Sequence, residues 1–148
     1  MSLNIYVPGE ACAQGRPRFS SFTGKDGKTY THAYDPVKSK NYKSFIKVMA
    51  IDAMDKQHWK YTDLPLEVEI FVYQTVPKSK TKKFKEAVER GQERPTTKPD
   101  VDNVAKTVLD ALSGVIYKDD KQIVSLTVKK YYTVNEPYVQ VLLKVWGW

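Results

Sequence analysis

The sequence predicts an α+β fold, a single domain over residues 1–148 with helices packed on a small mixed β-sheet. Between Leu66 and Tyr73 apolar residues alternate with others, which is the pattern of a β-strand. Between Val101 and Leu112 apolar residues recur every three or four positions, which predicts a helix over 101–113 with one buried face. Strand and helix patterns mix along a chain long enough to bury a core, so we expect one layered unit.

The ends of the chain also show strand patterns. Residues 3–7 alternate and predict a first strand that ends at Pro8-Gly9. Residues 122–134 and 138–146 predict two further strands. Because only Asn135-Glu-Pro137 separates these two strands, we expect them to pair as a hairpin.

A stretch rich in glycine and proline follows the first strand. Residues 10–36 predict either a long basic loop or a loose hairpin that turns at Gly24-Lys-Asp-Gly27. Asp35-Pro36 then has the form of a helix start, with an N-cap aspartate and a proline at the first helical position. Helical spacing of apolar residues predicts one long helix over 37–58, and we interpret its early lysines, Lys43 among them, as a solvated face.

The charge of the chain favours an anionic partner such as nucleic acid. The formal net charge is +7 and the pI is about 9.3. Residues 78–98 hold eight basic and three acidic side chains, a net charge of +5. We expect a short helix from about Lys80 to Arg90, ended by Gly91, and a mobile link to Lys98. This basic segment either binds the partner or is a solvated arm.

Cysteine and histidine usage excludes several classes of protein. Cys12 is the only cysteine, so no intrachain disulfide can form and a reducing compartment is indicated. His32 and His58 are too few and too scattered to predict a zinc site. No apolar run approaches the roughly 20 residues that cross a bilayer, and the N-terminus lacks a signal-peptide pattern. We therefore expect a cytoplasmic protein with no membrane contact.

Acidic residues gather around the helix predicted over 101–113, although the chain as a whole is basic. Each has a structural explanation: Asp100 or Asp102 could cap the helix, and Asp119 and Asp120 could occupy a tight turn. Lys106 could pair with an aspartate four residues away, Asp102 or Asp110.

Chain lengths allow these residues to meet. The helix carries the chain roughly 16 Å at about 1.5 Å per residue, and the next seven residues span at most about 23 Å. Residues 115–118 can therefore run back beside the helix and return an aspartate to Asp100 and Asp102. If the returning segment is extended, Asp119 and Asp120 face opposite ways and only one is a direct ligand.

Carboxylates that meet at one place repel, so their pKa values rise unless a divalent cation compensates. Oxygen ligands without cysteine or histidine favour Mg²⁺, for which Mn²⁺ can substitute, over zinc. Such an ion can activate water and stabilise charge on a phosphodiester, and Lys106 could neutralise a phosphate oxygen or the leaving group. A metal-dependent nuclease uses all these residues. A basic nucleic-acid-binding protein without catalysis is the main alternative.

The motif Lys98-Pro-Asp-Val-Asp-Asn103, followed by Lys106, Asp110-Ala-Leu112 and Tyr117-Lys-Asp-Asp120, resembles the signature of the RusA family of Holliday junction resolvases. Gly15-Arg-Pro-Arg18 is similar to a basic motif near the start of those proteins. The resemblance covers most of the chain and implies a small mixed sheet with packed helices. It also implies a homodimeric, Mg²⁺-dependent endonuclease that recognises four-way DNA junctions and cuts two opposing strands symmetrically during recombination and repair.

The resemblance further implies roles for single residues. Asp100, Asp102 and Asp120 would bind the metal, with Lys106 as the catalytic cation, Asp119 as an auxiliary acid and Asn103 as a supporting residue. The residues that we expect to bind DNA are all basic: Arg16, Arg18, Lys82, Lys83, Lys85 and Lys98. A Mg²⁺-dependent nuclease for other branched substrates is a further alternative. The aromatic residues Phe19, Phe22 and Tyr30 could stack on unpaired bases, but we expect them to pack against the core.

Overall fold

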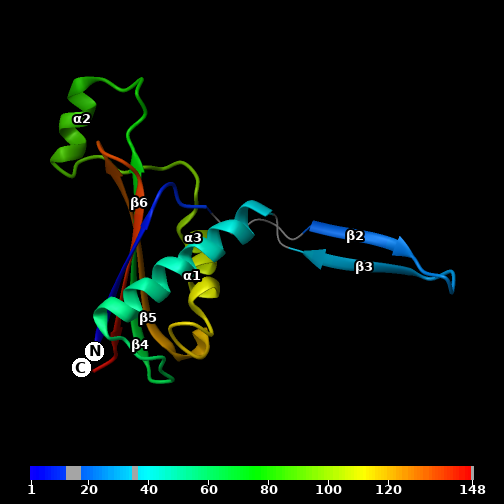
Figure 1. Cartoon of the computed structure of the whole chain (residues 1–148). Helices are drawn as coiled ribbons and strands as arrows, with labels where there is room; N and C mark the ends of the chain where they lie inside the picture. Colours follow the sequence, from blue (N-terminus) through cyan, green and yellow to red (C-terminus); the bar gives the residue numbers. More distant parts are fainter. Residues whose placement is uncertain (13–17, 35–36, 148) are drawn as a thin grey trace.

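A four-stranded mixed sheet lies at the centre of the computed structural model, which describes residues 1–12, 18–34 and 37–147 (Figure 1). The strands, in their order across the sheet, are β1 (Ser2–Pro8), β6 (Tyr138–Val145), β4 (Leu66–Thr75) and β5 (Ile123–Thr133). β6 runs antiparallel to both of its neighbours, whereas β4 and β5 run parallel. The predicted α+β fold is confirmed.

Two helices, α1 (Val37–Gln57) and α3 (Val101–Leu112), cover one face of this sheet (Figure 1). Alternate residues of β4, including Val68, Ile70 and Val72, are almost fully buried, as the alternation in the sequence predicts. They form one apolar core with the inner faces of the two helices. In the part of the chain that the structure describes, no helix has both the length and the apolar character needed to cross a membrane.

The predicted hairpin between the last two strands is wrong. β5 and β6 follow each other in the chain, but β4 lies between them and bonds to both. The chain leaves β4, passes through α3 and returns as a strand parallel to β4, which is the usual route between parallel neighbours. Alternation predicts that a segment is a strand, but it carries no information about which strand is its neighbour.

The basic stretch after β1 forms a hairpin, which was one of the two predicted outcomes. β2 (Arg18–Thr23) and β3 (Thr29–Tyr34) pair antiparallel, and the Gly24 N–H bonds to the Lys28 carbonyl at 2.8 Å across the turn. We call this ribbon, residues 18–34, the arm; it projects from the body beyond the start of α1 (Figure 1). Phe19, Phe22 and Tyr30 on the arm are exposed, so the expectation that they pack against the core is wrong.

The basic segment contains the expected short helix, α2 (Lys82–Glu89), whose first turn is capped by Thr81. The link that follows was expected to be mobile, but the structure ties it to the sheet. Arg94 donates to the Lys130 carbonyl at 3.0 Å and stacks its guanidinium on the Tyr131 ring at 3.8 Å. Gln74 then donates to the Lys98 carbonyl at 2.9 Å, which fixes the chain just before α3 begins.

Candidate active site

An open cleft of about 590 Å³ lies where α1, α3 and the turn before β5 meet. We call it the acid cleft because three aspartates and two lysines line it. The lining residues are Lys43, Asp102, Ala105, Lys106, Leu109, Asp110, Asp120 and Leu126.

Helix α3 supplies most of the cleft through one of its faces. Asp102, Lys106 and Asp110 follow one another at intervals of four residues, so they lie in a row along one side of the helix. Val104 and Val108 lie on the other side and are fully buried in the core. The amphipathic pattern that predicted the helix therefore also turns these charged side chains towards the cleft.

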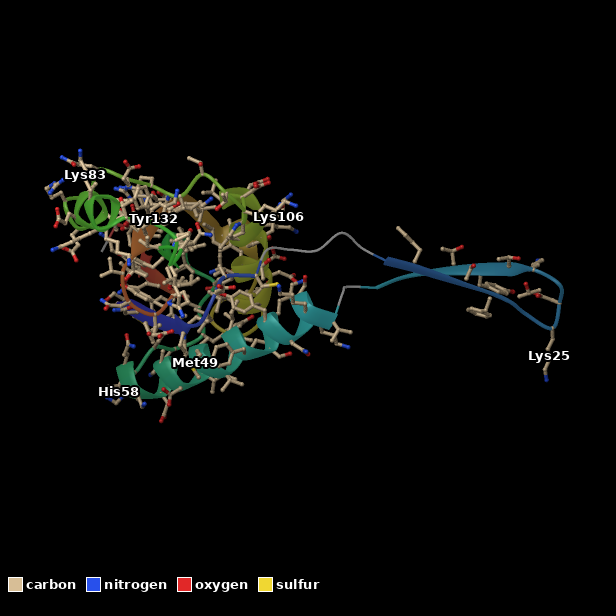
Figure 2. The ribbon with its side chains drawn as sticks, turned by 90° about the horizontal axis from the view of Figure 1, so that it is seen from above. Lys25, Met49, His58, Lys83, Lys106 and Tyr132 are labelled. Atoms are coloured by element: carbon tan, nitrogen blue, oxygen red, sulfur yellow. The ribbon has the colours of Figure 1, made fainter. Side chains whose placement is uncertain are left out.

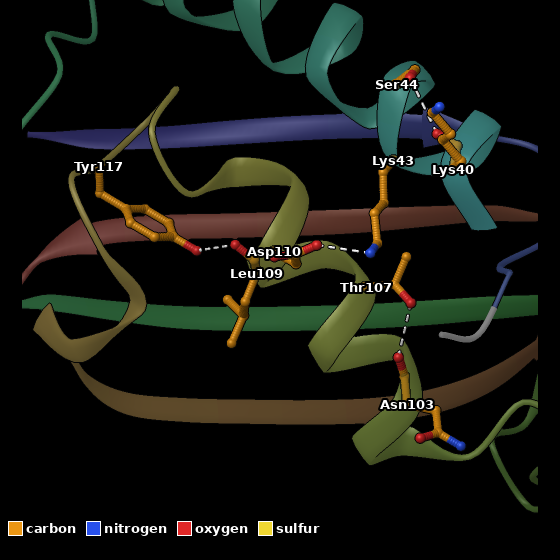
Figure 3. Close-up of polar contacts among 8 residues, drawn as sticks. All are labelled: Lys40, Lys43, Ser44, Asn103, Thr107, Leu109, Asp110 and Tyr117. Atoms are coloured by element: carbon orange, nitrogen blue, oxygen red, sulfur yellow. Dashed lines mark hydrogen bonds and ion pairs between the residues drawn. The ribbon is translucent and has the colours of Figure 1, made fainter. Parts of the chain in front are cut away.

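Asp100 occupies the N-cap position of α3, but its carboxylate makes no capping hydrogen bond. Capping therefore does not account for an acidic side chain here, although Asp100 is not among the residues that line the cleft. Asp102 follows in the first turn, where the helix dipole favours a negative charge. Asn103 is half-buried beside it, and its backbone carbonyl accepts a bond from the Thr107 hydroxyl at 3.0 Å (Figure 3).

The segment after α3 runs back along the helix, as the chain lengths allow. Tyr117 is fully buried and its hydroxyl donates to the Leu109 carbonyl at 2.7 Å (Figure 3). Trp59 donates from its indole to the Ile116 carbonyl at 3.1 Å, which holds the segment from the other side. The chain then reaches the cleft again at Asp120, which lies close enough to Asp110 near the end of α3 for the two negative charges to interact.

Asp119 and Asp120 have different surroundings. Asp119 caps a short 3₁₀ turn, η1 (Asp120–Gln122), and its carboxylate accepts a bond from the Lys121 N–H at 3.0 Å. Gln122 completes a capping box with Asp119 and also donates to the Thr62 and Leu64 carbonyls at 3.0 and 2.8 Å. Asp119 thus holds the turn in place, and Asp120 lines the cleft.

The two carboxyl groups nevertheless lie close together. A hydrogen bond between the side chains of Asp119 and Asp120 is the largest cause that raises the pKa of Asp120, followed by burial and by the negative charges of Asp119 and Asp110. The Lys121 N–H lowers the pKa of Asp119. The expectation that the two aspartates face opposite ways assumed an extended segment, but the chain enters a 3₁₀ turn at Asp120.

Lys43 of α1 reaches the cleft and pairs with Asp110 of α3 at 2.7 Å (Figure 3). Only 9% of Lys43 is exposed, so its interpretation as part of a solvated face is wrong. The sequence carries a signal for this: Lys43, Ile46 and Ala50 share the spacing of the buried stripe of α1. Within the described chain Lys106 forms no ion pair with Asp102 or Asp110, so the structural alternative of a helix-surface pair does not account for this lysine.

The four predicted DNA-binding lysines do not line the cleft. Arg16 is outside the described residues, and Arg18 begins β2, with its side chain not described. Lys82 and Lys83 are exposed on α2, and Lys83 is well separated from Lys106 in Figure 2. Of the remaining two, Lys85 is half-buried and Lys98 is exposed.

The cleft has the donor chemistry for a hard divalent cation but no closed cage. Among residues 1–12, 18–34 and 37–147, no three acidic, histidine or cysteine side chains stand close enough together to hold a metal ion. The third carboxylate of the cleft is Asp110 rather than the expected Asp100. Mg²⁺ usually keeps several waters and is bound by one or two carboxylates together with substrate phosphates. Asp102, Asp110 and Asp120 supply carboxylate oxygens of the kind that such an ion binds.

An acid cleft with lysines in its wall, on a small basic α+β protein, is an arrangement typical of nucleases. Residues 8–144 match the family model described as Endodeoxyribonuclease RusA, and the chain belongs to this family. It is also 46% identical over 146 residues to "Uncharacterized protein YqaN" of Bacillus subtilis (strain 168), a match that covers 96% of this chain and 95% of that protein. The family expected from the motifs is confirmed.

Replacement of Tyr117 by phenylalanine tests whether the return segment is held as described. The change removes the donor to the Leu109 carbonyl inside the core, so we expect the free energy of unfolding to fall by about 1–2 kcal/mol. Denaturant titration measures it, with Tyr61→Phe as the matched control, since Tyr61 is 52% exposed. Equal stability of the two variants would contradict the assigned role.

Proposed function

We propose that this chain is a Mg²⁺-dependent, structure-selective endodeoxyribonuclease that acts on DNA in the cytoplasm. It resolves four-way (Holliday) junctions by paired symmetric nicks during recombination and repair. The observation that carries the proposal is the acid cleft of a RusA-family chain, which Asp102 and Lys106 of α3 line together with Asp120 from the segment that follows α3.

In this proposal the metal ligands are Asp100, Asp102 and Asp120, although Asp100 is not among the residues that line the cleft. Bound Mg²⁺, or Mn²⁺ in its place, supplies Lewis-acid activation of water and charge stabilisation on the phosphate. Asp119 acts as an auxiliary acid by fixing the turn so that Asp120 faces the cleft. Asn103, half-buried next to Asp102 in the first turn of α3, is the proposed supporting residue.

Lys106 is the proposed catalytic cation. It lies one helical turn beyond Asp102, is exposed, and shares the cleft with Asp102 and Asp120. Its ammonium group can therefore approach a non-bridging phosphate oxygen or the leaving oxygen, where negative charge develops during cleavage. Lys43 is held against Asp110 and is nearly buried, so we assign it to positioning α3 against α1.

A homodimer suits the proposed reaction. A four-way junction presents two equivalent phosphates related by a two-fold axis, and two subunits related by the same symmetry present two acid clefts to them. Paired nicks follow from this match, because each subunit cuts one of two opposing strands.

The experiment compares cleavage of a four-way junction, a flap and a linear duplex of the same sequence in Mg²⁺, with EDTA as the control. We expect cleavage of the junction alone, at two symmetric positions, and none in EDTA. Equal rates on all three substrates would refute junction resolution. Cleavage that persists in EDTA would refute the metal-dependent mechanism.

Neutralising the basic helix tests its part in DNA binding. We expect the triple replacement of Lys82, Lys83 and Lys85 by glutamine to weaken junction binding, because up to three phosphate contacts are lost. The slope of log K against log salt should fall by up to about 2.7. Binding measured by anisotropy at several salt concentrations gives this slope.

The control removes the same net charge at the opposite end of the molecule. Its three sites are exposed lysines, replaced by glutamine: Lys56, Lys60 and Lys144. If the two triple variants have the same slope, the basic segment is a solvated arm and its assignment to DNA binding fails.

A further inference from the structure

The strands of the arm pair only with each other in the part of the chain that the structure describes. In the described chain β2 and β3 form a sheet of their own, and neither joins the central sheet. Two-stranded hairpins are marginally stable alone in water. Six residues per strand give the ribbon a length of about 20 Å, so most of it lies beyond the reach of the core.

Aromatic side chains are unusually exposed on this ribbon. Phe19 is 68% exposed, Phe22 is 61% exposed and Tyr30 is 44% exposed. Phe22 and Tyr30 lie opposite each other in the register, with ring centroids 5.4 Å apart and planes at 23°, so they form a stacked pair on one face. The Tyr30 hydroxyl donates to Asp26 at 2.7 Å, which fixes the tyrosine ring and leaves the phenylalanine ring open to a third planar group.

The charge of the arm selects the kind of partner. Arg18, Lys25 and Lys28 against the single acid Asp26 give the arm a net charge of +2. Lys25 lies at its tip (Figure 2). A partner that combines negative charge with flat apolar rings is a nucleic acid with accessible bases, because stacking uses the π-face that every base has.

The position of the arm relates it to the acid cleft. β3 leads into α1, whose first residue, Val37, precedes the cleft lysine Lys43 by six residues, or about 9 Å of helix. Lys106 lies on the side of the body from which the arm projects (Figure 2). DNA that leaves the cleft on this side would meet the arm.

We propose that the arm is a DNA-recognition element, in which the Phe22–Tyr30 pair stacks on a base exposed at the branch point of the substrate. This deepens the proposed function, on which it rests, by assigning the recognition of branched DNA to residues outside the acid cleft. Lys25 and Lys28, which are exposed near the tip of the arm, bind the flanking phosphates and hold the arm against the DNA.

The experiment places the fluorescent base 2-aminopurine at the branch point of a four-way junction and measures binding in EDTA, where cleavage does not occur. The test variants are Phe22→Leu and Tyr30→Leu, which keep an apolar side chain on the arm and remove a ring. We expect the wild-type protein to quench the probe, and each variant to lose the quenching and bind the junction about 5- to 150-fold more weakly. Binding to linear duplex should change less than about twofold.

Two controls make the result specific. Trp146→Leu removes an exposed ring (55% exposed) near the C-terminus, away from the arm, and should leave quenching and affinity unchanged. Tyr30→Phe keeps the ring and removes only the hydroxyl bonded to Asp26, so it should retain the quenching. Unchanged junction binding and quenching in Phe22→Leu would overturn the proposal.

The alternative is that the arm contacts a second copy of the chain instead of DNA, and this predicts a different experimental result. If sedimentation shows that Phe22→Leu dissociates a dimer while the probe signal per bound subunit is unchanged, the arm belongs to a protein interface and the proposal is overturned. The same experiments distinguish a failure of the proposed nuclease function from a failure of the proposed role of the arm. Wild-type protein that leaves the junction intact in Mg²⁺ but shows arm-dependent quenching in EDTA refutes the nuclease and supports the arm.

Discussion

Replacement of Asp102 by asparagine should lower the rate of junction cleavage by about 10³-fold or more. The carboxylate stands in the acid cleft on the first turn of α3, and the amide removes a metal ligand while keeping the size of the side chain. Junction binding should survive or strengthen, because a negative charge that faces phosphate is lost. Single-turnover cleavage in Mg²⁺ and anisotropy in EDTA measure the two effects.

Asp55→Asn is the matched control, since Asp55 is an exposed aspartate in the last turns of α1, outside the cleft. It should cleave at the wild-type rate. If Asp102→Asn instead loses binding together with cleavage and unfolds more easily, Asp102 has a structural role, and a nucleic-acid-binding protein without catalysis becomes the better description.

Asparagine at position 120 should also abolish cleavage, by a similar factor of about 10³, whereas asparagine at position 119 should lower the rate only a few-fold. Asp120 lines the acid cleft, and Asp119 accepts the Lys121 N–H as the cap of the 3₁₀ turn. An asparagine side-chain oxygen can still accept that bond, so Asp119→Asn keeps the cap. Parallel single-turnover assays of the two variants measure the contrast.

Thermal melts of the same two variants provide the control for folding, and both should melt near the wild-type temperature. The opposite ranking, with Asp119→Asn inactive and Asp120→Asn active, would exchange the roles of the two residues. Equal and complete loss in both would mean that the carboxyl groups, which share a hydrogen bond, act as one unit.

Two elements of this fold, β4 and α3, could be predicted from sequence because each has a strong local period. β4 and α3 bury one face each, so their apolar residues recur at two and at three or four positions. The neighbours of each strand could not be predicted in the same way. β5 and β6 adjoin in sequence, and only the insertion of β4 between them, a feature of the whole sheet, shows that they do not pair.

Chain length alone predicts that the segment after α3 can return to the cleft. Which aspartate then lines the cleft depends on hydrogen bonds to residues far away in the sequence, and these could not be predicted. The return to the cleft follows from the lengths of α3 and the following segment, which leave an aspartate within reach of Asp102. The choice of Asp120 for the cleft depends on the turn that Gln122 ties to the Thr62 and Leu64 carbonyls. These bonds join residues about sixty positions apart, and no local pattern marks them.

The register of the arm has a consequence for the diversity of related chains. Arg18 and Tyr34 face each other as partners, so the ribbon leaves the body and re-enters it at neighbouring points. A hairpin whose two ends lie side by side can be lengthened, shortened or replaced without a change in the fold of the rest of the domain. Substrate preference in such chains can then evolve by exchange of one hairpin, with the hydrolytic chemistry left intact.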